Sequence, residues 1–246
     1  MNYLYLSFWQ EWQALQGWCH EYLVTVLNTL PRSERPEILT RRHLLNLHTR
    51  VSFKRCVVHL RSSQWQLILQ DLHLFSYIYN VEEAQWLRSL FYRKYGARAT
   101  TSAQKQITWI SRCCKNRFVV NEESVVDRLA TLPARVVFVS FNHVDFYYQF
   151  AVLADSDILV TIHGAQLTNI LFMMPDSVVI ELFNPLLYVS HYHNFAVNCG
   201  LNHIAFWNTT IVSRGEEEVP KGWTPHLNHN IEVNATVLVE RVRSFV

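Results

Sequence analysis

Beyond Gln106, strand-like and helical segments alternate regularly along the chain. Short apolar runs rich in β-branched residues are followed by stretches whose apolar residues recur at helical spacing. The helical stretches begin near Asn121, Asp145, Ala165, His191 and Asn234. This alternation predicts an α/β fold with a parallel sheet of Rossmann type. We expect its strands at 107–111, 136–141, 157–162 and 177–183, and a further strand in the run HIAFW.

The first hundred residues carry a less regular pattern. Over 7–30 the apolar residues recur every three or four positions among polar ones, which predicts an amphipathic helix and not a membrane span. Strand-like runs follow at 51–60 and 65–69. A helix is then expected over 82–95, with Gly96 as its C-terminal cap. No complete domain closes in this region.

The length and composition of the chain bound its class. Half of the 246 residues are hydrophobic, which is enough for one large core or for one and a half smaller domains. We expect a partial N-terminal domain at 1–100 and a complete Rossmann-like domain at 106–246. The net charge is only +2, so charge gives no reason to expect nucleic acid or a membrane surface as a partner. No signal peptide and no transmembrane segment are recognised in the sequence.

Several short patterns could suggest metal or modification sites. The five cysteines lack zinc-ligand spacing, and His191 and His193 lack a third ligand, so no metal is expected there. Asp155 to Asp157 has the D-x-D form of a manganese site, but it precedes a strand at the end opposite the ligand crevice, which favours a capping role. Sequons begin at Asn208 and Asn234 and are compatible with a secretory lumen.

His163 and Gly164 lie where the strand predicted at 157–162 turns into the next helix. In a parallel sheet, the ligand crevice forms at the carboxyl ends of the strands, beside helix N-termini. Amide N–H groups that open a helix can hold a diphosphate, and a glycine lets it approach the backbone closely. The alternative is a tight turn with a polar cap and no ligand, which an isolated His-Gly pair would favour.

The residues around this turn resemble glycosyltransferase family 61. HGAQLTN at 163–169 matches the family's HGAxLTN, and LFMMPDSVVIELF at 171–183 is similar to its LFLPxxAxVxEL. Upstream, ITWISRCCKNRFVVNEESVV and VSFKRCVVHL resemble two further segments of the family, in the same order. The resemblance covers roughly residues 50–246, and several ordered motifs are far more specific than one short pattern.

The resemblance implies a GT-B enzyme that is inverting and metal-independent, needs no cofactor, and uses a UDP-sugar as donor. In that scheme, 106–246 is the donor half and 1–100 is the last part of the acceptor half. Likeness to the animal branch implies transfer of N-acetylglucosamine to a protein or glycan hydroxyl in the endoplasmic reticulum lumen or Golgi. The alternative is a noncatalytic nucleotide-sugar-binding or interaction protein, a shortened member of the family.

The resemblance also implies which residues bind the nucleotide-sugar. Arg112 and Arg117 match arginine positions of the family and would stabilise charge on the β-phosphate, although solvated loop arginines are the alternative. Glu181 would bind the ribose hydroxyls, or else be a buried, hydrogen-bonded acid. The remaining expected site residues come from the helix start: His163, Gly164, Ala165, Gln166, Leu167, Thr168 and Asn169.

Some of these roles have a local alternative. His163 would contact phosphate or fix the turn. Thr168 and Asn169 would reach the nucleotide or satisfy the first turn of the helix. Asn121 is expected to act as an N-cap. The sequence does not assign the general base that an inverting transfer needs, and the resemblance implies that it belongs to the acceptor half.

Overall fold

The computed structural model describes residues 3–5, 28–32, 37–39, 81–96, 104–112, 117–187, 189–214 and 228–246. The chain divides into two compact units. One comprises Met1–Asp71 with Ser89–Tyr95, and the other comprises Leu72–Arg88 with Gly96–Val246. The second unit contains the five-stranded sheet and all of the expected site residues.

The first unit has few described elements. β1 (Tyr3–Tyr5) pairs in parallel with β2 (Glu37–Leu39). α5 (Val81–Tyr95) belongs to both units, and Gly96 follows it at φ 102°, which confirms the predicted helix and its glycine cap.

The predicted helix over 7–30 is wrong at its C-terminal end. Residues 28–30 form a turn, because Pro31 disfavours the helical conformation in the residue before it. The remainder of that helix, and the strands predicted at 51–60 and 65–69, lie outside the described residues.

The second unit is built on a parallel sheet, as predicted. Its strands stand in the order β4-β3-β5-β6-β7, and every neighbouring pair is parallel. Four of them agree with the predicted bounds to within one residue at each end. The strands are β3 (Gln106–Ser111), β4 (Arg135–Ser140), β5 (Ile158–Ile162), β6 (Val178–Leu182) and β7 (Asn202–Phe206).

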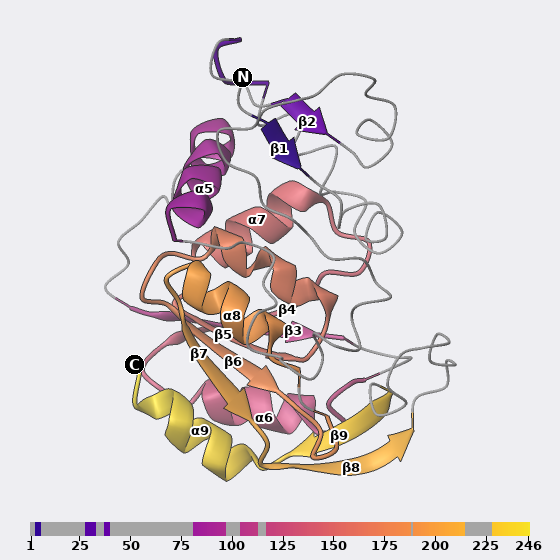
Figure 1. Cartoon of the computed structure of the whole chain (residues 1–246). Helices are drawn as coiled ribbons and strands as arrows, with labels where there is room; N and C mark the ends of the chain where they lie inside the picture. Colours follow the sequence, from indigo (N-terminus) through magenta and orange to yellow (C-terminus); the bar gives the residue numbers. More distant parts are fainter. Residues whose placement is uncertain are drawn as a thin grey trace. The chain divides into compact units, whose positions relative to one another are not determined.

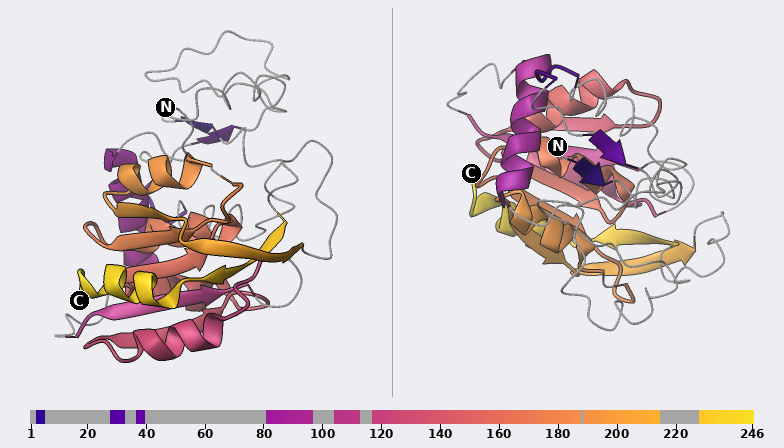
Figure 2. Two further views of the ribbon diagram at one scale, coloured as in Figure 1. Left: turned by 90° about the horizontal axis from the view of Figure 1, so that it is seen from below. Right: turned by 45° about the horizontal axis from the view of Figure 1, so that its top comes forward.

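Helices cover both faces of this sheet (Figures 1 and 2). α6 and α9 lie on one face, and α7, α8 and η2, a 3₁₀ helix, lie on the other. Because both faces are covered, every residue of the inner strands β3, β5 and β6 is buried, which explains why most of their positions are apolar. The bounds are α6 Glu122–Leu129, α7 Phe146–Ala154, η2 Ala165–Phe172, α8 His191–Asn198 and α9 Ala235–Arg243.

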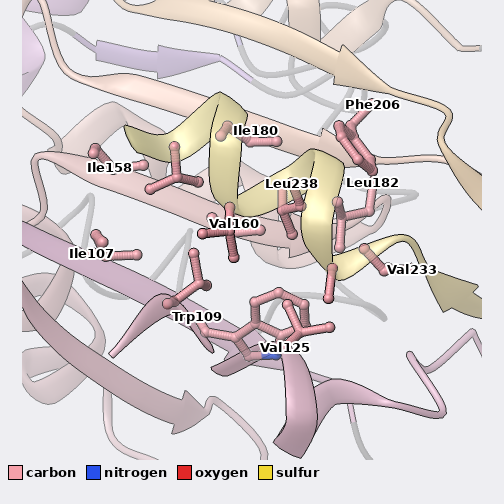
Figure 3. Close-up of a cluster of buried hydrophobic side chains, with 14 of the residues drawn as sticks. Ile107, Trp109, Val125, Ile158, Val160, Ile180, Leu182, Phe206, Val233 and Leu238 are labelled. Atoms are coloured by element: carbon pink, nitrogen blue, oxygen red, sulfur yellow. The ribbon is translucent and has the colours of Figure 1, made fainter. Parts of the chain in front are cut away.

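A single hydrophobic cluster fills the space between the sheet and the α6–α9 pair (Figure 3). Trp109, Val160 and Ile180 come from the three inner strands, while Val125 and Leu238 come from the two helices. All five side chains are almost completely buried. Burial of such side chains contributes roughly 1.5–3 kcal/mol each, so this cluster is a main source of the domain's stability.

η2 corrects the type of helix expected after His163. The segment starts at Ala165 as predicted, but the Leu167 amide donates to the Gly164 carbonyl at 3.0 Å, which is a 3₁₀ bond. Over so short a segment, apolar residues at Leu167 and Ile170 fit a period of three residues as well as one of 3.6. The side chains at 167–172 are all buried, so this segment is enclosed by the fold.

An antiparallel hairpin was not predicted. β8 (Thr209–Arg214) pairs with β9 (His229–Val233), and their register shifts between Ile211 and Ser213. β9 also contacts the segment before α6, where the Val120 amide donates to the Ile231 carbonyl at 2.8 Å. The hairpin therefore joins the end of the sheet to the start of α6.

Asn121 has a different role from the predicted N-cap. It precedes α6, but its side chain makes no capping hydrogen bond. Instead, its Nδ2 donates to the Val233 carbonyl at 2.8 Å and its Oδ1 accepts from the Val233 amide at 3.0 Å. Both amide atoms of the side chain are thus used to hold β9, which leaves neither to cap the helix.

The capping interpretation of the D-x-D segment is confirmed for Asp157. Its Oδ2 accepts from the Gln106 amide at 2.8 Å, at the amino end of β3. Asp155 is the C-terminal cap residue of α7. The Ser156 hydroxyl lies 2.5 Å from that of Thr108 and donates to the Val152 carbonyl.

Arg88, in the part of α5 that belongs to the second unit, is buried beneath two helix ends. Its Nε donates to the Leu171 carbonyl at 2.8 Å and its Nη2 to the Cys199 carbonyl at 2.7 Å. A cation is favourable beside the carbonyl groups at helix C-termini. Burial raises the pKa of the Cys199 thiol to about 12. The charge and the hydrogen bond of Arg88 act in the opposite direction and lower this pKa.

No helix in the described part of the chain combines the length and the hydropathy that a membrane span requires.

Candidate functional site

The order of strands in the sheet marks one position for a ligand. From β3 the chain first adds β4 on one side and then returns to add β5 on the other, so the direction of winding reverses between β3 and β5. Ligands of open parallel sheets bind at such a reversal, outside the carboxyl ends of the strands. Arg112 follows β3 there, and His163 and Gly164 follow β5.

Arg112 and Gly164 are in close contact at this position. A Cβ atom added to Gly164 would lie 2.0 Å from Nη1 of Arg112 and 3.1 Å from its Cζ. Gly164 has an extended backbone, with φ 167°, which any residue could adopt. The glycine is therefore required by the space that the guanidinium occupies and not by its backbone conformation.

This contact changes the expected role of Gly164. We expected the missing side chain to let a phosphate approach the backbone directly, but the guanidinium of Arg112 occupies that space. The turn instead carries a positive group at the start of η2. Guanidinium groups and the amides that open a helix both favour anions.

The other residues of HGAQLTN mostly hold the turn together. Nε2 of Gln166 donates to Oγ1 of Thr161 at 3.1 Å and to the Ile162 carbonyl at 3.2 Å, so this side chain folds back onto the end of β5. The Thr168 hydroxyl donates to the Ala165 carbonyl at 2.8 Å. This bond agrees with the alternative in which Thr168 satisfies the first turn of the helix.

Leu167 and Asn169 point into the fold. Leu167 is completely buried in the core. Nδ2 of Asn169 donates to Oε1 of Gln149 on α7 at 3.1 Å, while its buried Oδ1 accepts no hydrogen bond from any residue that the structure describes. Among the seven residues of the motif, Ala165 and Gln166 are the partly exposed ones.

Arg117 lies at the far end of the loop that starts at Arg112. Its backbone is left-handed, with φ 54°, and its side chain is partly exposed. The next amide, that of Phe118, donates to Oδ1 of Asn230 at 3.3 Å, so this end of the loop rests on the hairpin.

Glu181 lies inside the sheet and not on the surface of the crevice. Its side chain has no exposure to solvent. Oε1 lies 2.5 Å from Nδ1 of His163, and Oε2 lies 2.8 Å from Nε2 of His203. Because both oxygens are used, the expected bond to ribose is not available in this arrangement, and Glu181 agrees with the alternative of a buried, hydrogen-bonded acid.

Burial and hydrogen bonding shift the pKa of the Glu181 carboxyl, and burial shifts that of His203. Burial raises the pKa of the Glu181 carboxyl, while the hydrogen bond and the charge of His163 act to lower it. Burial also lowers the pKa of His203 from 6.5 to about 4. His203 is therefore uncharged at neutral pH, and it can supply only one N–H group.

Aromatic rings fix the orientation of His163. Its ring stacks on Phe183, with centroids 5.4 Å apart and planes at 22°, and it contacts Tyr192 at 5.5 Å. Phe183 in turn stacks on Trp207 at 5.6 Å. These rings extend across the carboxyl ends of β5, β6 and β7, and His163 retains only 5% exposure.

His193 connects the buried group to the surface. This exposed residue of α8 lies with its Nδ1 3.3 Å from Nδ1 of His203, and the two rings meet edge to face at 81°. The pattern at 191–193 therefore contributes an exposed histidine whose ring meets that of His203 edge to face. The described part of the chain has no cluster of three or more His, Cys, Asp or Glu side chains arranged to hold a metal ion.

Sequence reasoning missed the role of His203, although the pattern of the strands contained a signal for it. Glu181 lies opposite Ala205 in the pairing of β6 with β7, and His203 lies two residues before Ala205. Alternate residues of a strand share one face. Once β7 is known to lie beside β6, His203 is therefore a candidate for contact with the buried Glu181, because it shares a strand face with the residue opposite Glu181.

The two sequons lie side by side on the surface. Asn208 and Asn234 are both exposed, and the Asn234 amide donates to the Asn208 carbonyl at 3.0 Å. Oδ1 of Asn234 also caps α9 by accepting from the Val237 amide. They border a polar cavity of about 660 Å³ that also includes Arg128 and Glu232.

Known proteins with similar sequences give the family. The family described as Glycosyltransferase 61 matches residues 16–180. The chain is 33% identical over 82 residues to the EGF domain-specific O-linked N-acetylglucosamine transferase of Gallus gallus, and 39% identical over 83 residues to that of Drosophila melanogaster. It is 36% identical over 100 residues to Protein O-linked-mannose beta-1,4-N-acetylglucosaminyltransferase 2 of Tetraodon nigroviridis.

The family match and the individual matches differ in extent. The individual matches cover 32%, 32% and 38% of this chain, respectively, but only 15%, 15% and 17% of the relatives. The family match extends over more than half of the chain and includes the loop at Arg112 and the turn at Gly164. The chain belongs to glycosyltransferase family 61.

Proposed function

We propose that this chain binds a UDP-sugar at the carboxyl ends of β3 and β5 and takes part in an inverting glycosyl transfer. The observation that carries the proposal is the Arg112 guanidinium packed against Gly164, at the reversal of a parallel sheet. A positive, bidentate donor at the start of a helix suits a diphosphate. Membership of a glycosyltransferase family supports the sugar nucleotide as the ligand.

In this proposal, the chain stabilises the leaving group without a divalent metal. Departure of UDP leaves negative charge on the β-phosphate, and fixed hydrogen-bond donors stabilise such charge most in a site shielded from water. Arg112 and the first amides of η2 supply these donors, and Arg117 adds charge from the other end of the loop.

The proposed architecture is GT-B. The Rossmann-like domain at 106–246 serves as the donor half, and 1–100 serves as part of the acceptor half, which supplies the general base. The names of the relatives support N-acetylglucosamine as the sugar and a protein or glycan hydroxyl as the acceptor. Action in the endoplasmic reticulum lumen or Golgi is part of the same proposal and follows from the family resemblance.

Titration calorimetry of the whole chain with UDP in the presence of EDTA tests this proposal. We expect binding that EDTA does not abolish and that Arg112→Ala weakens roughly a hundredfold, as expected for the loss of charge-stabilising contacts. Arg128→Ala is the matched control, because Arg128 is exposed and contacts Thr236 on α9. Binding that disappears on chelation, or that Arg112→Ala leaves unchanged, would overturn the proposal.

A further inference from the structure

The hydrogen bonds around Glu181 limit where protons can lie. His203 is uncharged and has one ring N–H. Its Nε2 faces Oε2 of Glu181 at 2.8 Å, and its Nδ1 faces Nδ1 of His193 at 3.3 Å. A proton on Nε2 lets His203 donate to the carboxyl group and accept from His193, whereas a proton on Nδ1 would make it donate to His193 and accept from a protonated Glu181. We assign the first tautomer.

The remaining proton lies between Glu181 and His163. An ionised Glu181 with an uncharged His163 would leave a net negative charge in a fully buried site, which is costly. With His203 protonated on Nε2, two arrangements avoid this cost. Either His163 is protonated on both nitrogens beside a carboxylate, or Glu181 is protonated and donates to Nδ1 of His163.

Both arrangements have the same consequence for the outer nitrogen of His163. An imidazolium carries hydrogen on Nδ1 and on Nε2. An uncharged imidazole that accepts at Nδ1 carries its hydrogen on Nε2. In each case Nε2, which is directed away from Glu181, is a hydrogen-bond donor and not a base.

We propose that Glu181 is a positioning residue that keeps Nε2 of His163 protonated, so that His163 donates a hydrogen bond to a phosphate oxygen of the bound nucleotide. This inference rests on the proposed function for the presence of a nucleotide at the turn. His163 is directly followed by Gly164, against which the Arg112 guanidinium lies, and the proposal assigns both donors to one anion site.

The groups that surround the His163 ring come from four elements. Glu181 on β6 and His203 on β7 lie on the Nδ1 side, and α8 contributes Tyr192 in contact with the ring and His193 behind His203. Arg112, from the loop after β3, is the cation at the neighbouring residue. Burial raises the pKa of the Glu181 carboxyl, and the hydrogen bond and charge of His163 act to lower it.

Nitrogen NMR of the whole chain, labelled with ¹⁵N-histidine, tests the protonation directly. His163→Gln and His203→Gln assign the signals. At neutral pH and without UDP, we expect Nε2 of His163 and Nε2 of His203 to give signals of protonated nitrogens. An unprotonated Nε2 in His163 would overturn the inference, because His163 would then present a lone pair to the site.

Addition of UDP tests the contact. We expect the Nε2 signal of His163 to shift on binding, whereas an unmoved signal at saturating UDP would overturn the contact. If calorimetry shows that UDP does not bind at all, the proposed function fails, while the protonation of His163 is still decided by the spectra without UDP.

Two substitutions of Glu181 separate positioning from general damage. In Glu181→Gln the amide oxygen can accept from His203 and the amide nitrogen can donate to Nδ1 of His163, so Nε2 keeps its hydrogen. We expect UDP affinity within a few-fold of the parent. Glu181→Leu removes the group that keeps Nε2 of His163 protonated, and we expect UDP affinity to fall roughly tenfold in the folded protein. Equal affinity in the two folded variants would contradict a positioning role.

Discussion

The Arg112 guanidinium lies against the α-carbon of Gly164, in the space that a side chain at this position would need. A Cβ atom on residue 164 would lie only 2.0 Å from Nη1 of Arg112. The two residues follow different strands and are 52 positions apart (164 − 112) in the sequence. Their contact spans the reversal between β3 and β5, the position at which open parallel sheets bind ligands. The size of residue 164 therefore controls the position of a charge.

Gly164→Ala should displace the Arg112 guanidinium and weaken UDP binding while the fold remains. The clash involves the far end of a flexible side chain, which can move at little cost to the core. Misplacing such a charge costs on the order of 3 kcal/mol, or roughly a hundredfold in affinity. Calorimetry with UDP, together with thermal unfolding of the same samples, measures both effects.

A double-mutant cycle tests whether the alanine acts through Arg112. If it does, adding Gly164→Ala to Arg112→Ala should change UDP affinity very little, because the displaced group is already absent. Additive losses would show that residue 164 affects the nucleotide by another route. Gly200→Ala is a control for glycine replacement, since Gly200 lies at φ 76° beside Pro175 and not beside the site.

The sheet could be predicted because its inner strands are buried on both faces. Their sequences are mostly apolar and rich in β-branched residues, and segments with helical spacing follow them. β8 and β9 lack this signal. Most side chains of β8 are exposed, and in β9 only Ile231 and Val233 form a short buried apolar stripe. The contact of β9 with the segment before α6, between Val120 and Ile231, joins positions that are distant in sequence.

For the site, the sequence located the turn but not the contacts that cross between strands. The resemblance pointed to Arg112, Gly164 and Glu181 as residues of one site. That Glu181 joins His163 to His203 depends on the order and register of β5, β6 and β7, which a single sequence does not contain. The same limit explains why Asn121 was predicted to be an N-cap: its position at a helix start is visible in the sequence, whereas its hydrogen bond to Val233 of β9 is not.

His203 should make the stability of the fold depend on pH. Its pKa falls from 6.5 to about 4 on burial, so the stability that it contributes is full above pH 6.5 and is lost as the pH falls through about 4. The loss amounts to on the order of 3 kcal/mol. Glu181 acts in the opposite direction, because its pKa is raised and its protonation favours the folded state as the pH falls.

His203→Gln isolates this contribution. The glutamine amide can still donate to Glu181, but it does not titrate. Urea unfolding of the parent and the variant, across the interval between the two pKa values, should show a difference in free energy of unfolding that shifts in favour of the variant as the pH falls. A difference that stays constant would contradict the lowered pKa of His203.

Arg88→Met should destabilise the second unit. The buried guanidinium donates to the Leu171 and Cys199 carbonyls, and methionine fills similar space without these bonds. We expect a loss of about 2–4 kcal/mol in the free energy of unfolding. Arg93→Met, an exposed position on the same helix, is the matched control and should change stability by less than about 0.5 kcal/mol. Equal effects of the two substitutions would show that the buried bonds contribute little.

Asn121 offers a choice between two structural roles that different substitutions can separate. As an N-cap, Asn121 could be replaced by serine with little loss, because serine caps helices about as well. As the residue that holds β9, Asn121 could not be replaced by serine without loss. One hydroxyl is too short to pair with both the amide and the carbonyl of Val233.

We therefore expect Asn121→Ser and Asn121→Ala to lower the free energy of unfolding by similar amounts, about 1–3 kcal/mol for two hydrogen bonds. Asn234→Ser is the control at a working cap, since the Asn234 side chain accepts from the Val237 amide, and it should be nearly neutral. Chemical denaturation of the three variants beside the parent measures the effect. If Asn121→Ser were as stable as the parent while Asn121→Ala was not, Asn121 would act on α6 as a cap, and the hairpin would be held in place by other bonds.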